Sequence, residues 1–378
     1  MAVHRGSTGR WPAHAVLFPL AAAYAAVAVP LSFFALTGGP VWLPGIAGPA
    51  GHAHELLFGF AAAVVAGYLI NKAAWPYLAA LVGAWLVARG AGLAAPGGAV
   101  AVLAGAAFFG LAAYATIPPY VRTAKKWRNR ALGVILLALF GAGAAYAFAA
   151  LGSGPHGRPA ALAVGVDAVT TLMLFMGGRI IAPAVGGYLE RRGIAQEARV
   201  QPAVEGALLV AMGVVVAAGL IPGAEPLRVA ALTVAGVLAA VRLARWRLWR
   251  CGGRPDLIAM GVGYGWLAAG LLLQAGALSG VVPVTPTAAV HAVLVGALGT
   301  LTITVMTRVH RLRIRDRVSG FAVPGVAVAL IAVAAAARIA ADGVPVWRVE
   351  WLAVATVAWS LAYGLLLTVL LRPRRIKP

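Results

Sequence analysis

The feature that most constrains this chain is a series of long apolar runs, each separated from the next by a short polar or basic stretch. A bilayer is crossed by about 20 apolar helical residues. Lipid admits only helices or closed barrels, because every backbone polar group must be satisfied internally. The runs are continuous and do not alternate with polar residues, so helices are favoured over barrel strands. Composition agrees, since 62% of the residues are hydrophobic and 11% are charged, against about 25% charged in a soluble domain.

These runs predict an all-α polytopic membrane bundle of about 12 transmembrane helices. No soluble domain interrupts them, so residues 1–378 are interpreted as a single transmembrane domain. Short junctions rich in Pro and Gly indicate tight hairpins between antiparallel spans. The predicted spans are 13–37, 52–71, 74–95, 98–120, 131–151, 162–187, 203–221, 227–249, 256–278, 287–308, 320–341 and 349–371.

The positive charges support this count and orient the chain. With the N-terminus placed inside and the spans alternating, the inner segments hold all but six of the 31 Lys and Arg residues. This is the positive-inside distribution, so we expect both termini in the cytoplasm. The net charge of +21 is then spread over short loops facing anionic lipid, and a nucleic-acid partner is excluded. The six exceptions are Arg89, Arg158, Arg179, Arg228, Arg338 and Arg348.

The sulfur-containing residues offer little chemistry. The single cysteine, Cys251, excludes an internal disulfide and a cysteine-based metal cluster. It lies in a basic loop, and we interpret it as an inert thiol. Met173, Met176 and Met306 are of the type that binds copper, but methionine in apolar spans usually serves packing, which is our interpretation here.

Three of the seven histidines fall at one predicted membrane level, the outer face. His52 and His54 begin the second span, and His291 lies near the start of the tenth. Neutral imidazole is the commonest metal ligand and holds haem iron or copper. Each histidine alone is better interpreted as an interfacial polar residue. As a group they favour a metal site, because polar residues in spans tend to face the bundle interior.

The spacing of His52 and His54 limits how they act. On a continuous helix they would point about 200° apart and could not hold one metal. Because Pro49-Ala-Gly51 precedes them, we expect the helix to begin at or after His52. Either the pair brackets a helix start and converges there, or the two serve different centres. Gly59, seven residues after His52, would share its face and leave room for a flat macrocycle or for close helix packing.

Several charged residues within the spans need partners. Glu55 lies in the first turn of the predicted second span, where capping the helix is the simpler interpretation and orienting an imidazole is the alternative. Arg179, in the sixth span, would pair with a haem propionate or an acidic side chain, or extend to the inner interface. Arg89, Asp167 and Arg338 lie nearer the outer ends of their spans, where they can pair with one another or with a cofactor.

Four stretches resemble the NnrS family of bacterial membrane proteins. They occur in the order of that family and span most of the chain. Two segments depart from its pattern, since Asn71-Lys-Ala-Ala-Trp75 and Val309-His-Arg-Leu-Arg313 replace Asn-Trp-Thr-Gly-like and Gly-His-Thr-Gly-Arg segments. The four stretches are His52-Ala-His-Glu-Leu-Leu-Phe-Gly-Phe60, Met176-Gly-Gly-Arg-Ile-Ile181, Arg254-Pro-Asp-Leu257 with Gly263-Tyr264 and Trp266, and His291-Ala-Val-Leu-Val-Gly-Ala-Leu-Gly-Thr300 running to Met306-Thr-Arg308.

The resemblance implies a multi-pass protein of the bacterial inner membrane that contains haem and copper and is linked to nitric oxide tolerance and denitrification. Its expected partners are the lipid bilayer and nitric oxide, with an unknown electron donor. Reduction, sensing and scavenging of nitric oxide all stay open, and so does enzyme activity. The site residues that it implies are His52, His54 and His291 for metal, Glu55, Arg179 and Arg308 for orienting a ligand or pairing with a cofactor, and Gly59 for cofactor packing.

A secondary transporter of a small solute is the alternative function. Twelve spans with both ends inside is a common transporter plan. Few acidic residues fall in the middle of the predicted spans for proton coupling, and the two halves show no convincing sequence repeat. An optical spectrum separates the two hypotheses, because a haem protein shows a Soret band and a transporter is colourless.

Overall fold

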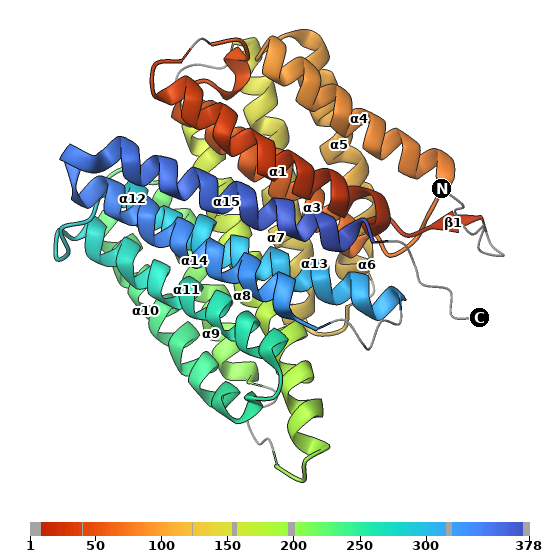
Figure 1. Ribbon diagram of the computed structural model, residues 1–378, viewed down its shortest axis with the longest axis vertical. Coiled ribbons are helices and arrows are strands. Elements are labelled where there is room, and N and C mark those ends of the chain that lie inside the picture. The colour runs from red at the N-terminus through yellow and green to blue at the C-terminus, as the bar shows by residue number, and fades with distance from the viewer. Residues whose placement is uncertain are drawn as a thin grey trace. The chain divides into compact units, whose positions relative to one another are not determined.

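The structure is a computed structural model that describes residues 9–39, 41–122, 124–152, 157–195, 201–314 and 320–372. Long helices dominate it (Figure 1). Within these residues 12 helices are long and apolar enough to cross a membrane, which confirms the predicted all-α polytopic fold. The cytoplasmic placement of the termini stays a prediction. Two of the histidines, His4 and His156, lie outside the described residues.

The observed spans agree closely with the predicted ones. The largest shift is in the sixth span, which begins five residues earlier than expected, and every other boundary lies within four residues of its prediction. The spans are His14–Leu36, Gly48–Leu69, Trp75–Ala94, Ala99–Arg122, Trp127–Leu151, Gly157–Glu190, Pro202–Gly219, Glu225–Arg245, Pro255–Leu278, Pro286–Leu312, Ala322–Gly343 and Pro345–Leu370.

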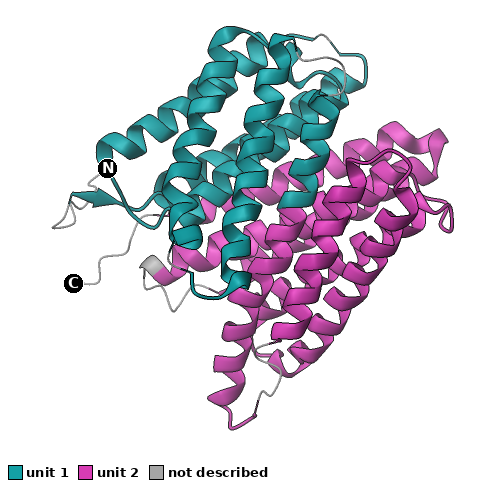
Figure 2. Ribbon diagram, turned by 180° about the vertical axis from the view of Figure 1, so that it is seen from behind, with its two compact units in different colours: residues 1–168 teal, residues 169–378 magenta. Residues whose placement is uncertain are grey.

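The chain divides into two compact units, residues 1–168 and 169–378, which are coloured separately in Figure 2. The long helix α8 (Gly157–Glu190) contributes to both. Unit 1 also contains one short antiparallel pair of strands, with Arg10 opposite Ala74 and Trp11 opposite Ala73. In chain order the elements of unit 1 before α8, with these two strands included, are β1 (Arg10–Trp11), α1 (His14–Leu36), η1 (Pro44–Ile46), α2 (Gly48–His54), η2 (Glu55–Ala61), α3 (Ala62–Leu69), β2 (Ala73–Ala74), α4 (Trp75–Ala94), α5 (Ala99–Thr116), α6 (Pro118–Arg122), α7 (Trp127–Phe148) and η3 (Ala149–Leu151).

Unit 2 is a succession of neighbouring helices, in which α9 packs on α10, α10 on α11, α11 on α13, α13 on α14, and α14 on α15. Its tenth span is built from three consecutive segments, α12, η5 and α13. The elements of unit 2 after α8 are α9 (Pro202–Gly219), α10 (Glu225–Arg245), η4 (Leu248–Cys251), α11 (Pro255–Leu278), α12 (Pro286–His291), η5 (Ala292–Ala297), α13 (Leu298–Ile314), α14 (Ala322–Gly343), η6 (Pro345–Trp347) and α15 (Arg348–Leu370).

Glycine and aromatic residues build the interior of unit 1. A Cβ atom at Gly143 would lie 2.6 Å from the Phe109 ring, and one at Gly165 would lie 2.6 Å from the Phe58 ring. Only glycine permits these approaches, and small residues are what membrane helices use to pack closely. Large apolar side chains such as Leu103 remain exposed on the outside. That exposure suits a surface that faces lipid.

The second span begins earlier than the sequence suggested. The helix α2 starts at Gly48, with Pro49 in its first turn. Proline is accepted there because the first N–H groups of a helix have no partner within it. His52 and His54 therefore both lie inside a helix, and the prediction that the helix begins at or after His52 was wrong. Of the two alternatives, the one in which the pair brackets a helix start is excluded.

Two segments of the bundle have the wider π-helical winding. They are η2 in the second span, which follows His54, and η5 in the tenth span, which follows His291. In a π-turn the backbone bonds run from residue i to i+5, and such turns are frequent at functional sites. Each π segment here begins at the residue after a candidate metal ligand.

Candidate functional site

A buried carboxylate, Glu55, lies at the centre of a polar cluster in unit 1, with 1% of its surface exposed. Arg89 of α4 donates from Nη1 to Oε2 at 2.6 Å, and the Tyr24 hydroxyl of α1 donates to the same oxygen. The other oxygen, Oε1, lies 2.8 Å from Nδ1 of His54. A carboxylate in the membrane interior is costly unless it is paired and hydrogen-bonded. The hydrogen bonds and the ion pair that Glu55 requires come from side chains of α1, α2 and α4.

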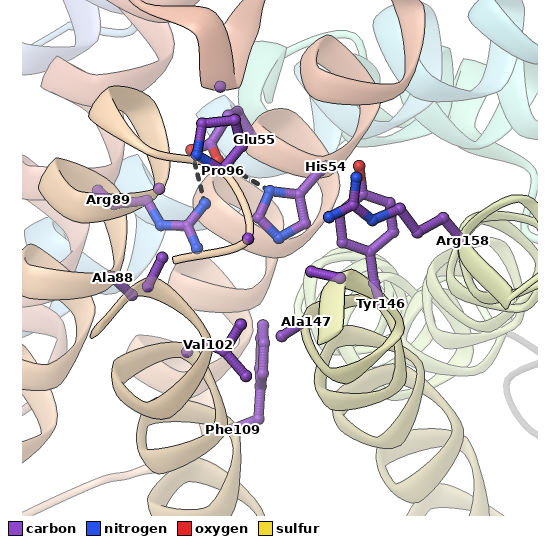
Figure 3. A pocket seen from close by; sticks show the side chains of 16 residues that line it. His54, Glu55, Ala88, Arg89, Pro96, Val102, Phe109, Tyr146, Ala147 and Arg158 are labelled. Atoms are coloured by element: carbon purple, nitrogen blue, oxygen red, sulfur yellow. Dashed lines mark hydrogen bonds and ion pairs between the residues drawn. The ribbon is translucent and has the colours of Figure 1, made fainter. Parts of the chain in front are cut away.

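The bond to Glu55 sets the state of the His54 ring. A carboxylate paired with a guanidinium accepts hydrogen bonds, so Nδ1 carries the hydrogen and Nε2 carries the lone pair. Nε2 faces the pocket of Figure 3 and has no hydrogen-bond partner in the described part of the chain. The ring stacks on Tyr146 of α7, with centroids 4.4 Å apart. A carboxylate–imidazole pair of this kind orients metal-binding histidines.

The capping role predicted for Glu55 was wrong. The helix starts at Gly48, so Glu55 lies beyond the first turn, and no side chain caps that helix end. The misplaced helix start is the reason for the error. The hydrogen bond to His54 is the contact that the alternative, orienting role requires.

His52 faces a different neighbour from His54. Its Nδ1 lies 3.0 Å from the Ser32 hydroxyl of α1. Two residues that are two positions apart on a continuous helix point about 200° apart. The different contacts of His52 and His54 agree with this angle. Among the described residues no three His, Cys, Asp or Glu side chains are grouped so as to hold a metal ion.

Gly59 accommodates a side chain from a neighbouring helix. A Cβ atom there would lie 2.9 Å from Nη1 of Arg89, and the Gly59 carbonyl accepts from Trp85 Nε1 at 2.9 Å. Of the two roles expected for Gly59, room for a flat macrocycle or close helix packing, these contacts correspond to close helix packing. The shared face with His52 stays a prediction, because the seven-residue spacing behind it assumes regular winding and η2 is wider.

A pocket opens beside His54 in unit 1 (Figure 3). Its polar residues are His54, Glu55, Arg89 and Arg158, with Tyr146 beside them. The cavity volume is about 50 Å³, which suits a few waters or a small ion. Its walls are mostly small residues of η1, α4, α5, α7, η3 and the loop between α4 and α5, namely Gly45, Ala88, Gly92, Gly97, Ala101, Gly105, Ala147 and Ala150.

In unit 2, His291 is held by its own backbone. Its Nδ1 lies 2.7 Å from the Thr287 carbonyl, which can only accept, so Nδ1 donates and Nε2 carries the lone pair. Thr285 caps the start of this helix by accepting from the Ala288 N–H at 3.1 Å. Five residues after His291, a Cβ atom at Gly296 would lie 2.6 Å from the Trp266 ring.

Arg308 lies far from His291 on the same span. Seventeen residues separate them, which is about 25 Å along a helix. Arg308 Nη1 is 3.2 Å from Asp256, whose carboxylate is also held by Arg254 at 2.6 and 2.8 Å. Arg308 therefore joins two of the four characteristic stretches at the other end of the span, and it does not pair with a group bound at His291.

Arg179 has an acidic partner. Its Nη2 lies 2.8 Å from Oε1 of Glu205, and buried Arg242 lies 3.2 Å from Oε2. Arg242 also donates to the Leu174 carbonyl at 3.0 Å. A Cβ atom at Gly178 would lie 1.9 Å from the Arg242 guanidinium, so the Gly-Gly-Arg stretch is shaped to admit that side chain. Of the partners expected for Arg179, the structure contains the acidic side chain.

Several residues of these clusters were missed from the sequence. Glu205 and Arg242 carried a signal, because each is a charge at the edge of an apolar run. Arg158 was counted only as an outer charge. Tyr24 and Tyr146 carried no signal, since aromatic residues are common in membrane spans.

The helices and their internal charge clusters define a polytopic α-helical membrane protein, with one oriented imidazole at the start of a π segment in each unit. Comparison with protein families identifies one family. The family model described as NnrS protein matches residues 12–374, nearly the whole chain, and the chain belongs to that family. The resemblance drawn from the four stretches is thereby confirmed. A search of curated proteins finds no match.

Proposed function

We propose that this chain is a haem- and copper-containing membrane protein that acts in nitric oxide tolerance, with His54 and His291 as metal ligands. The observation that carries the proposal is the His54 ring, whose Nδ1–H is held by buried Glu55 while Nε2 faces a pocket. Family membership adds the expectation of haem and copper.

The donor set fits a cofactor that brings most of its own ligands. Haem iron needs one or two axial protein ligands, and histidine is a common one. Each unit offers one imidazole with its tautomer set by a hydrogen bond at Nδ1. A bare copper ion normally takes several protein ligands, and the described residues gather no set of three. The His54 cavity, at about 50 Å³, fits a single ion or a diatomic molecule and is much smaller than a porphyrin.

The chain's own residues prepare the ligand. Glu55 keeps the hydrogen on Nδ1 of His54 and, as an anion, makes Nε2 a stronger donor. Arg89 and Tyr24 keep Glu55 in place and charged. Iron or copper, when bound, supplies the coordination position that nitric oxide takes. Nitric oxide is small and nearly apolar, so it reaches such a site through lipid.

The transporter alternative loses support at the buried carboxylates. Proton coupling uses intramembrane acids that can take up and release a proton. Glu55 and Glu205 are each held in a buried ion pair with arginine. No contact among the described residues favours transport over metal binding.

The test is purification in mild detergent, followed by an optical spectrum and elemental analysis. We expect a Soret band and bound copper. His54→Ala and His291→Ala should each reduce one of the two cofactors to about a tenth or less of the wild-type content. His156→Ala, a histidine that the sequence places between spans, is the control and should retain both.

All variants are compared at equal monodispersity on size exclusion, so that loss of fold is not mistaken for loss of a ligand. A folded, colourless and metal-free wild-type protein would refute the proposal. Equal cofactor content in all three histidine variants would show that the assigned ligands are wrong.

A further inference from the structure

The pocket of unit 1 carries one more positive charge than negative. Among the described residues that line it, the only carboxylate is Glu55, and that group is bound to Arg89 at 2.6 Å. The second guanidinium, Arg158 of α8, forms no ion pair with any residue that the structure describes. A partly buried cation of this kind calls for an anion, because burial without a counter-charge is costly.

The surroundings of Arg158 keep its donors available. Its guanidinium lies over the Tyr146 ring, with the guanidinium carbon 5.2 Å from the ring centroid. Its Nε is buried and has no hydrogen-bond partner within the described chain. Figure 3 shows the Arg158 guanidinium next to the Tyr146 ring, and His54 next to that ring as well.

The shape of the pocket restricts what can enter. Its cavity is about 50 Å³. Gly97 borders Arg158 with a φ of +97°, and a Cβ atom there would lie 3.3 Å from Ala150 and 3.6 Å from Nη2 of Arg158. The fork of guanidinium N–H groups matches planar oxyanions with two acceptor oxygens.

We propose that the pocket beside His54 binds a small planar oxyanion, of the carboxylate or nitrite type, with Arg158 as its charge partner. This goes beyond the proposed function and stands whether or not the protein carries a metal. A free anion and the carboxylate of a bound cofactor present the same group to Arg158, and the experiment separates the two.

The test is calorimetric titration of the purified full-length protein with formate, at constant ionic strength set by chloride. Wild type should bind formate and should not bind benzoate, whose ring exceeds the cavity. Arg158→Gln should weaken formate binding about tenfold to a hundredfold, the range of a charge-assisted hydrogen bond. Arg158→Lys should fall between the two, because lysine retains the charge without the fork.

Arg348→Gln is the matched control. It removes an arginine charge whose side chain is 60% exposed, in the other unit. Its formate affinity should stay within about twofold of wild type. Ala147→Leu narrows the pocket without altering Arg158 and should also abolish binding, so the proposal stays testable if Arg158→Gln fails to fold.

Two further arms identify the source of the anion. Protein reconstituted in zwitterionic lipid should bind formate with the same affinity before and after anionic lipid is added. Competition by anionic lipid would identify a lipid phosphate as the occupant and overturn the proposal. Haem-loaded protein that no longer binds formate, next to haem-free protein that does, would make the cofactor carboxylate the natural occupant and support the site. Absence of formate binding in wild type, or equal loss in Arg158→Gln and Arg348→Gln, would overturn it.

Discussion

Replacing Glu55 by glutamine tests the central cluster of unit 1. The substitution preserves size and one acceptor oxygen but removes the negative charge. Arg89, with 5% of its surface exposed, is then a buried cation without its ion-pair partner. His54 also loses the anionic acceptor that sets its tautomer.

The size of the effect follows from the contacts. Glu55 accepts from Arg89, Tyr24 and His54. At about 1.5–3 kcal/mol for each hydrogen bond to a charged group, the three would reach roughly 4–9 kcal/mol. Bonds that share one acceptor are not additive, and glutamine retains part of them. Breaking a buried ion pair by removing one partner costs about 3–5 kcal/mol, and we expect a loss of unfolding free energy in that range.

The assay is unfolding by sodium dodecyl sulfate in mixed micelles, followed by the fluorescence of the 11 tryptophans. Glu225→Gln, at an exposed position in the first turn of α10, is the matched control and should change the unfolding free energy by less than about 0.5 kcal/mol. The double variant Glu55→Gln/Arg89→Met should recover at least about half of the loss. A buried ion pair replaced by apolar groups is often close to neutral.

Two results would refute this reasoning. Glu55→Gln within about 1 kcal/mol of wild type would mean that the buried charge of Arg89 finds another partner. A double variant as unstable as the sum of the two single variants would mean that Glu55 and Arg89 are not energetically coupled.

Two smaller predictions concern packing and thiol chemistry. Gly59→Ala should lower the unfolding free energy by about 1–3 kcal/mol in the same assay, because the new Cβ lies 2.9 Å from Arg89. Gly141→Ala, where a Cβ has nothing within 4 Å, is the control and should be neutral or raise the unfolding free energy by up to about 1 kcal/mol. Equal effects of the two substitutions would contradict this reasoning. Burial raises the pKa of the Cys251 thiol, which is 0% exposed, so a thiol reagent should react at least about tenfold more slowly with folded than with unfolded protein, and faster as pH rises. Rapid labelling of the folded protein at neutral pH would refute it.

Hydropathy was sufficient for the spans because lipid imposes length and apolarity on each one separately. The ninth span was expected at 256–278 and is Pro255–Leu278. The misjudged starts have a local cause. Pro49 was taken as a helix breaker, yet it lies in a first turn, where its missing N–H is harmless. The sixth span extends from Gly157 to Glu190, past its apolar core, because its polar ends lie outside the run that hydropathy detects.

The site was less accessible to sequence reasoning because its bonds join distant positions. Glu55 and His54 are neighbours, so an orienting contact was foreseeable. Arg89 is 34 residues from Glu55, and Tyr24 is 31. We expected Arg89, Asp167 and Arg338 to pair with one another or with a cofactor, but the partner of Arg89 is Glu55, and Arg338 lies 3.2 Å from Asp342.

The π segments show a further limit of periodicity. In both spans a glycine follows the histidine by five residues, as in His54 to Gly59 and His291 to Gly296. A regular helix rotates about 140° over five residues, so the two would face apart. In a π-turn the residue five positions on lies one turn above. A pattern search at 3.6 residues per turn therefore does not detect this five-residue spacing of histidine and glycine.

The two π segments also differ in a way that bears on chemistry. Each glycine admits a side chain from a neighbouring helix, Arg89 at Gly59 and Trp266 at Gly296. In unit 1 that side chain is a cation, which holds the carboxylate that orients His54. In unit 2 it is an aromatic ring, and the neutral Thr287 carbonyl orients His291. Because Nδ1 of His54 faces an anionic acceptor and Nδ1 of His291 a neutral one, the two imidazoles are unequal ligands. That inequality agrees with our proposal of two different metals.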